Sequence, residues 1–343
     1  MINFAPLNLI YMKRSNLINL LIMLILLLMF ACKEGTNKQS IGEDLNKNLQ
    51  IEIPEFNADS AFQFVKVQTD FGPRVPNTEA HEQCALYLFQ QLYRFCDTAY
   101  VQSFDAIAYD KTVLKSKNII GSFFPEAKRR VLLGAHWDSR PMADYDPNPA
   151  NRNKPIDGAN DGASGVGVLL EIARQLHIKN PTIGIDIVFF DSEDYGTPAS
   201  ENLEGDWWAL GSQYWAKKAY QNGYKADYGI LLDMVGGQNA TFYHEGFSSL
   251  YAPEVISKIW GKAYQFGYGS YFINESANPI TDDHYYVNKY AYIKMINIIH
   301  QDKNSNTGFT SVWHTLDDNI SNIDKQTLEA VGKTVLAVLY DEK

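Results

Sequence analysis

The sequence has few cysteines and none of the spacings that build thiol-based sites. Its 343 residues include three cysteines, with no Cys-x-x-Cys pair for zinc or redox chemistry. It also lacks a Gly-x-Ser-x-Gly segment, which disfavours a serine hydrolase. Cys84 and Cys96 fall in one expected helix, where their separation along the axis is about 18 Å. A disulfide needs Cα atoms within roughly 7 Å, so we expect two free thiols.

Positive charge is also scarce. The formal net charge is −10, and no run of Lys or Arg indicates a basic patch. An acidic surface repels the phosphate backbone of nucleic acids. We therefore expect no nucleic-acid partner. Hydrophobic residues make up 45% of the chain and charged residues 20%, a globular balance rather than that of a disordered chain.

One long apolar run stands out, at residues 17–30. Lys13 and Arg14 precede it, and Ala31-Cys32 follow, an order typical of a secretory signal. The run is shorter than the roughly 20 residues that span a bilayer, which weakens the alternative of an uncleaved anchor. The segment resembles a bacterial lipoprotein signal. That resemblance predicts export and a lipid anchor at Cys32, on a membrane facing the periplasm or the cell surface.

Three regions follow from this organisation: a signal at 1–32, a polar tether at 33–54 and one α/β domain at 55–343. Apolar strands alternate with helices along the domain. This pattern predicts a mostly parallel mixed sheet covered by helices on both faces. The expected strands are 113–122, 130–135, 185–190, 228–234, 240–243 and 291–298. The expected helices are 79–96, 163–178, 209–221, 252–266 and 324–340.

Acids and histidines follow several of these strands. His136 and Asp138 come after strand 130–135, two residues apart, so in extended backbone they point the same way. A hydrogen-bonded structural pair is as good an interpretation as a metal site. Asp161 lies among closely spaced glycines before helix 163–178, where ordinary helix capping is an alternative. The glycine density indicates a backbone that passes close to another group.

Three acids follow strand 185–190, namely Asp191, Glu193 and Asp194. Buried carboxylates repel one another unless a cation lies between them, although a solvated loop would also explain them. His314 adds an imidazole, and imidazole with carboxylate oxygens suits zinc. Because ligands bind at the carboxyl ends of strands in such sheets, we expect these clusters to meet.

The order of these segments resembles that of the zinc aminopeptidase superfamily, over roughly 58–341. The shared segments are His136-x-Asp138, Asn160-Asp161, Glu193-Asp194, Asp233, Asp282-Asp283-His284 and His314-Thr315. Within that superfamily, Trp313-His314-Thr315 and Asp282-Asp283-His284 are similar to glutaminyl cyclases, and Asp-Phe-Gly-Pro-Arg at 70–74 is similar to their bacterial branch.

This resemblance implies a zinc-dependent acyltransferase that cyclises N-terminal glutamine of peptides to pyroglutamate. It implies one zinc, held by Asp161, Asp194 and His314, with Glu193 as general acid and base. The alternative is a di-zinc aminopeptidase that releases N-terminal residues.

The resemblance also assigns residues around the zinc. Asp233 and Asp283 match acids that orient and stabilise substrate, and Trp313 and Phe309 match aromatic pocket walls. His136, with Asp138 beside it, would either support the zinc ligands from behind or hold a second metal.

Two departures from the family pattern matter. Animal cyclases have a Glu-Glu pair where this chain has Glu193-Asp194. Their active-site disulfide has no counterpart, because Ala135 and Val166 occupy those positions. The loop 195–208 does not align, and either Trp207 or Trp208 is the candidate for a further pocket wall.

Overall fold

A computed structural model describes residues 53–201 and 203–342. The predicted signal ending at Cys32 and nearly all of the predicted tether lie outside these residues. Within them, no helix is long and apolar enough to cross a membrane. The described residues form one compact unit.

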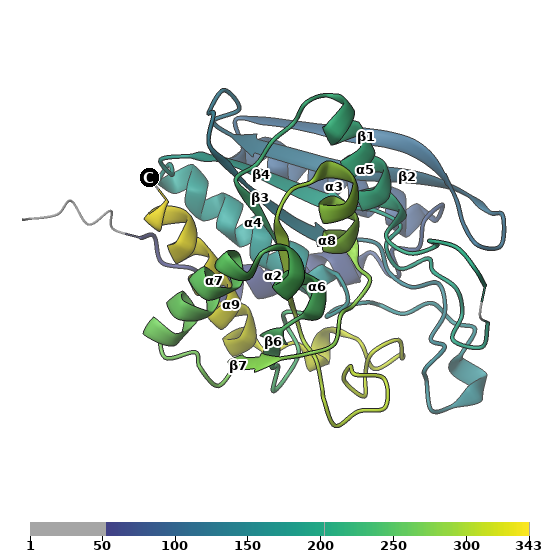
Figure 1. The fold of residues 1–343 in the computed structure, drawn as a ribbon. Coiled ribbons are helices and arrows are strands. Elements are labelled where there is room, and N and C mark those ends of the chain that lie inside the picture. Colours follow the sequence, from purple (N-terminus) through teal and green to yellow (C-terminus); the bar gives the residue numbers. More distant parts are fainter. Residues whose placement is uncertain (1–52, 202, 343) are drawn as a thin grey trace, which may run out of the picture. The chain divides into compact units, whose positions relative to one another are not determined.

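A six-stranded sheet forms the centre of this unit (Figure 1), and its strands lie in the order β1-β2-β4-β3-β5-β8. The strands are β1 (Thr98–Ile107), β2 (Val113–Phe123), β3 (Arg130–His136), β4 (Gly184–Phe190), β5 (Tyr228–Asp233) and β8 (Met295–Ile299). The pairs β4–β3, β3–β5 and β5–β8 are parallel, whereas β1–β2 and β2–β4 are antiparallel. The prediction of a mostly parallel mixed sheet is confirmed.

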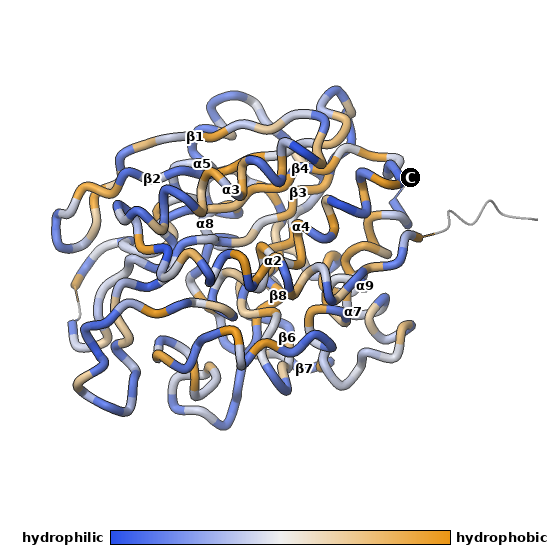
Figure 2. Tube along the Cα trace, turned by 180° about the vertical axis from the view of Figure 1, so that it is seen from behind, coloured by the Kyte–Doolittle hydropathy of each residue, from blue (hydrophilic) through white to orange (hydrophobic). Residues whose placement is uncertain are grey.

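Helices cover both faces of the sheet. The helices are α2 (Ala58–Asp70), α3 (Glu79–Phe95), α4 (Ala163–Ile178), α5 (Leu210–Gln221), α6 (Gly246–Tyr251), α7 (Pro253–Gln265), α8 (Asp283–Tyr286) and α9 (Lys325–Asp341). Val131 and Leu133 of β3 point into the core on the α4 and α9 side, while Leu132 joins the core under α5. Successive strand side chains alternate between faces, so an unbroken apolar strand supplies both cores. Figure 2 shows the resulting concentration of hydrophobic residues in the central strands and neighbouring helices.

Most predicted elements are confirmed, whereas α2, α6 and β7 were not predicted. The expected strand 291–298 is β8 at Met295–Ile299, because Val287–Ala291 continues α8 as a helical turn and Tyr292 takes a φ of 56°. Sequence reasoning missed β1, whose side chains are mostly exposed or half-buried, so no apolar run marks it. A separate two-stranded ribbon joins β6 (Phe242–His244) to β7 (Phe272–Ser276).

The two described cysteines are free thiols, as the helix spacing predicted. Cys84 is buried within α3 and Cys96 is the residue that ends it. Burial raises the pKa of the Cys84 thiol to about 12, so it stays protonated at neutral pH.

Candidate active site

The acids and histidines meet at the carboxyl ends of the parallel strands, where α/β sheets bind ligands. His136 is the last residue of β3, and Asp233 is the last residue of β5. Asp191 follows β4 directly, so Glu193 and Asp194 lie just beyond the same edge. The predicted convergence is confirmed, because parallel neighbours end side by side.

Two sets of three side chains have ligand atoms within 4.8 Å of one another: Asp161 with Asp194 and His314, and Asp161 with His136 and Asp233. Asp161 belongs to both. One of its oxygens lies 3.0 Å from Nε2 of His136, and the other lies 3.6 Å from Nε2 of His314. Asp161 therefore faces both histidines at once and does not cap α4, whose first turn has no side-chain cap.

The first set has the chemistry of a metal site. His314 Nε2 lies 3.2 Å from an oxygen of Asp194, and neither Asp194 oxygen has a hydrogen-bond partner among the described residues. The Asp194 side chain is only 1% exposed. Buried polar atoms normally have partners, and two carboxylates with one imidazole are ligands that zinc accepts. These three residues fit a divalent cation.

The pKa values of the buried acids also indicate a site for a cation. Burial raises the pKa of Asp233 to about 7. Burial also raises the pKa of Glu193 well above its usual value; His136 opposes the shift, whereas the charges of Asp282, Asp194 and Asp283 add to it. Such crowding of acids is costly without a positive charge nearby.

Each ligand-bearing loop is held by a buried carboxylate. Asp138 accepts hydrogen bonds from the backbone N–H groups of Glu193 at 3.0 Å and Asp194 at 3.1 Å. Asp318 does the same for Asn160 at 2.8 Å and Asp161 at 3.1 Å. Asp138 thus positions a loop, a role that the sequence did not predict, and it also lies 3.6 Å from Nδ1 of His136.

His314 is oriented by a pair of residues that sequence reasoning missed. Asp144 lies 3.4 Å from Nδ1 of His314 and is bonded by the Arg140 guanidinium at 2.7 and 2.8 Å. Metal-binding histidines commonly use the second ring nitrogen this way. Both residues lie in the irregular segment after β3, where no periodic pattern marks them.

The glycines around Asp161 allow a close approach, as predicted. A Cβ on Gly162 would lie 2.6 Å from the His136 ring, and one on Gly165 would lie 2.2 Å from the Leu232 carbonyl oxygen. Three non-glycine residues at the site, Ser192, Met234 and His314, have φ near 50°. Such backbone is uncommon outside glycine and concentrates at functional sites.

A pocket of about 190 Å³ opens onto the first set of ligands. Its lining residues are Asp161, Glu193, Asp194, Trp208, Asp233, Met234, Ile280, Thr281, Asp282, Ile299, Phe309, Trp313 and His314. The predicted walls Phe309 and Trp313 lie together, with ring centroids 4.5 Å apart. Of the two tryptophan candidates, Trp208 is the wall; it stacks near His314 and over the Arg140 guanidinium.

Three predicted site residues lie behind this surface. His136 and Asp138 are buried and do not line the pocket. Of the Asp282-Asp283 pair, Asp282 lines the pocket and caps α8, whereas Asp283 is fully buried beside it. Asp283 therefore affects Glu193 through its charge rather than by facing the cavity.

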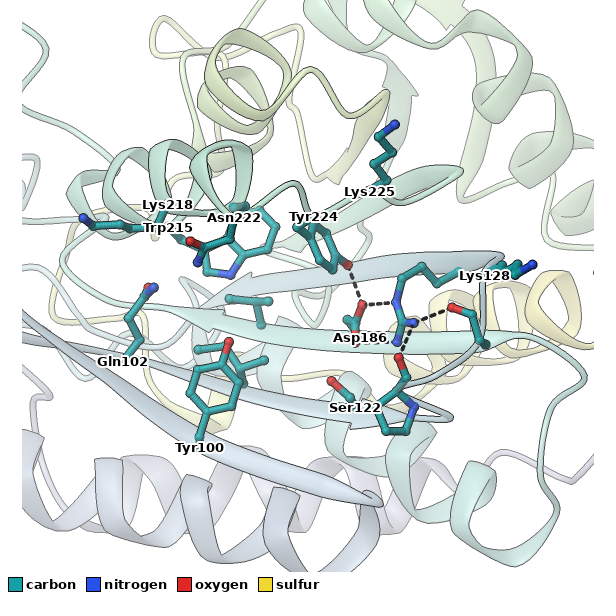
Figure 3. Close-up of a pocket in the computed structure, with 16 residues that line it drawn as sticks. Tyr100, Gln102, Ser122, Lys128, Asp186, Trp215, Lys218, Asn222, Tyr224 and Lys225 are labelled. Carbon is teal, nitrogen blue, oxygen red and sulfur yellow. Dashed lines mark hydrogen bonds and ion pairs between the residues drawn. The ribbon is translucent and has the colours of Figure 1, made fainter.

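A second cavity, of about 440 Å³, lies at the opposite ends of the strands (Figure 3). Its one lining carboxylate, Asp186, is occupied by Arg130 at 2.5 and 3.0 Å and by Tyr224 at 2.5 Å. Figure 3 shows the amino groups of Lys128 and Lys225 extending away from the cavity. No histidine or cysteine lines it, so it lacks the ligand set of the first pocket.

The fold and this site define an α/β enzyme with a candidate metal centre. The sequence model of peptidase family M28 matches residues 118–339, and the chain belongs to that family. It is similar to the glutaminyl-peptide cyclotransferase of Drosophila melanogaster, at 28% identity over 281 residues, covering 75% of this chain and 73% of that protein.

Two solved structures are closer in sequence. One is a Zn-dependent exopeptidase from Parabacteroides distasonis, with 54% identity, a TM-score of 0.84 and coverage of 85% of this chain and 100% of that one. The other is the glutaminyl cyclase of Tannerella forsythia, with 54% identity, a TM-score of 0.83 and coverage of 84% and 100%. The predicted relationship to glutaminyl cyclases of this superfamily is confirmed.

Proposed function

We propose that this chain converts N-terminal glutaminyl residues of peptides to pyroglutamate and releases ammonia. The observation that carries the proposal is one small pocket that combines three metal-type ligands, a separate buried carboxylate and aromatic walls. The relatives named as glutaminyl cyclases support it.

One zinc ion would be held by Asp161, Asp194 and His314, whose side chains all line the pocket. Bound there, it would act as a Lewis acid on the substrate's γ-carbonyl. The other set of ligands includes His136, which does not line the pocket. This favours one ion rather than two.

Glu193 is the proposed general acid and base. It lines the pocket without belonging to either ligand set. It takes a proton from the substrate's α-amine as that nitrogen bonds to the γ-carbonyl carbon. It then delivers a proton to the side-chain amide nitrogen as the carbon–nitrogen bond breaks and ammonia leaves. Its raised pKa suits the delivery step.

The remaining work is to fold the glutamine side chain back on itself. The nucleophile is already part of the substrate, so orientation and exclusion of water supply much of the rate. Trp208, Phe309 and Trp313 form walls that suit both tasks. Asp233, on the same surface, is placed to accept a hydrogen bond from the α-amine.

A di-zinc aminopeptidase is the second candidate. The observation that favours it is the intact set of His136, Asp161 and Asp233. Such an enzyme would shorten a peptide by its N-terminal residue, whereas a cyclase keeps every residue.

Mass spectrometry of a Gln-initiated peptide incubated with the purified protein tests the two directly. Loss of one ammonia from an intact peptide is expected, and loss of a whole residue would move the protein to the aminopeptidases. Glu193→Gln should lower kcat by about 10²–10⁴-fold. Retention of most activity in that variant would overturn the role given to Glu193.

We further propose export and membrane anchoring through a lipid on Cys32. The positive segment, the apolar run at 17–30 and Ala31-Cys32 support this. Cys32→Ser should move the protein from the membrane fraction to the soluble fraction of expressing cells. An unchanged membrane fraction would contradict the lipid anchor.

A further inference from the structure

A groove of about 700 Å³ adjoins the candidate active site. Ile280 and Phe309 line both the groove and the catalytic pocket, so the two spaces meet at these side chains. One wall is residues 276–280, at the end of β7 and just after it, and the other is the loop after β8, residues 301–309. Nothing in the proposed chemistry uses this groove.

The size of the catalytic pocket makes the groove relevant. At about 190 Å³ the pocket is smaller than the roughly 300–1,000 Å³ of sites that enclose whole ligands. It has room for one reacting residue and not for a peptide. A peptide chain that leaves the pocket past Ile280 and Phe309 enters the groove.

The first wall is held rigidly from behind. Glu245, which is fully buried, accepts the backbone N–H of Ile280 at 2.8 Å and bonds Nε2 of His284 at 2.9 Å. The backbone N–H of Ala277 also donates to the His244 carbonyl at 2.9 Å. These bonds tie the wall to the helix that carries Asp283.

The second wall is stabilised by its own turn. The Ser305 and Thr307 hydroxyls bond each other at 2.8 Å, and Thr307 accepts the backbone N–H of Phe309 at 3.2 Å. Gly308 has a φ of 81°, which lets the loop close. The Asp302 N–H donates to the Gly308 carbonyl at 2.9 Å. A groove with two braced walls is preformed, which lowers the entropic cost of binding a flexible peptide.

The groove surface is almost entirely uncharged and combines polar with apolar groups. Apart from Pro279, Ile280 and Phe309 near the pocket, its larger side chains are amides and hydroxyls, such as Asn278 and Asn306. Lys303 is the one charged residue among those that line it.

Lys303 is free to turn toward a ligand. Its amino group lies 2.9 Å from Glu275 and 4.0 Å from the centre of the Tyr243 ring. The side chains of the ion pair are 38% and 66% exposed, and such surface pairs contribute little. A carboxylate on a peptide in the groove can therefore compete with Glu275 for this lysine.

We infer that the second and third residues of the substrate peptide bind in this groove, and that Lys303 favours an acidic side chain there over a basic one. The inference rests on the proposed cyclase function. In this arrangement the amide and hydroxyl side chains of the groove bind the peptide backbone. The positive charge of Lys303 selects among peptide side chains.

The first test compares glutamine amide, which ends before the groove, with the tripeptide amide Gln-Ala-Ala. Asn278 lines the groove, and its exposed side chain makes no hydrogen bond within the described chain. Asn278→Trp would therefore place a bulky ring in the groove without breaking an existing bond. We expect KM for the tripeptide to rise several-fold while the kinetics of glutamine amide stay the same. Equal effects on both substrates, or none on either, would overturn the inference.

The second test addresses Lys303. Wild type should process Gln-Glu-Ala amide with a higher kcat/KM than Gln-Lys-Ala amide, and Lys303→Glu should shift that ratio by about two- to fivefold in the opposite direction. Lys66→Glu is the matched control, since Lys66 also pairs with an exposed acid but lies on α2. An equal shift of the kcat/KM ratio in the Lys66→Glu control would contradict the role proposed for Lys303.

These outcomes separate the two proposals. If wild-type protein loaded with zinc cyclises neither glutamine amide nor the tripeptides, the cyclase function fails. If it cyclises all of them and the variants change nothing, only the groove assignment fails.

Discussion

The carboxylate of Asp138 receives the backbone N–H groups of Glu193 and Asp194, at 3.0 and 3.1 Å. One side chain from the loop after β3 thus positions both the proposed acid–base residue and a proposed zinc ligand on the loop after β4. The distance between two catalytic elements depends on a residue that does not line the pocket.

Asp138→Asn should weaken catalysis through this link. An amide offers one acceptor oxygen where the carboxylate offers two, so one buried N–H would lose its partner. We expect a loss of about 10–100-fold in kcat or zinc affinity, as for other residues that orient metal ligands. Asp324→Asn is the control: Asp324 also accepts a backbone N–H, at the start of α9, and neither lines the pocket nor bonds the loop of Glu193. Comparable losses in both variants would contradict the positioning role.

Removal of each histidine should separate the two possible metal positions. With one zinc at Asp161, Asp194 and His314, elemental analysis should give a zinc-to-protein ratio near one for wild type and for His136→Ala. His314→Ala should lose most of its zinc. A wild-type ratio near two that falls to one in His136→Ala would establish a di-zinc centre instead.

Gly165→Ala should destabilise the fold next to the site. The added Cβ would lie 2.2 Å from the Leu232 carbonyl oxygen, a backbone atom of β5 that cannot shift cheaply. Overpacking of this kind costs about 1–3 kcal/mol of unfolding free energy, and more where backbone must move. Gly261→Ala, inside α7 with nothing within 4 Å, should instead stabilise by about 0.5–1 kcal/mol. Urea denaturation of both variants checks the contrast.

Low pH should reduce the stabilisation that Glu245 gives to the groove wall at residues 276–280. Burial opposes ionisation, but hydrogen bonds from His284 and Ser248 lower the pKa of Glu245 to about 2. A lowered pKa in the folded state stabilises the protein above the unfolded value near 4.5, and this stabilisation is lost as the pH falls toward 2. The free energy of unfolding that this lowered pKa contributes at neutral pH is on the order of 3 kcal/mol. The difference in unfolding free energy between wild type and Glu245→Gln should shrink from pH 7 to pH 3. A constant difference would contradict this.

The sequence predicted those site residues that lie at or just after the ends of the central strands. Strands β3, β4 and β5 are buried along their whole length and mostly apolar, and each ends at or just before a histidine or acid. Parallel strands end at a shared edge, so His136, Glu193, Asp194 and Asp233 could be brought together without coordinates. The glycines before α4 likewise signalled a close approach, which the structure places against His136 and Leu232.

The rest lay in irregular segments, where side-chain order has no fixed spatial period. Asp144 and Arg140 orient His314 from the loop after β3, and nothing in that loop marks them. The choice between Trp207 and Trp208 was equally open, because two neighbouring residues in a loop can point either way. β1 escaped notice since an edge strand with exposed side chains needs no apolar run.

The sequence by itself determined the α/β class, the strand ends and the set of acids and histidines, because hydrophobic periodicity and residue chemistry are local properties. Only the tertiary structure decided that Asp161 faces two histidines, that Asp282 rather than Asp283 lines the pocket, and that a groove continues from it. Those are distances between loops far apart in the chain. They depend on packing and on buried hydrogen bonds such as those of Asp138 and Asp318, which no local pattern records.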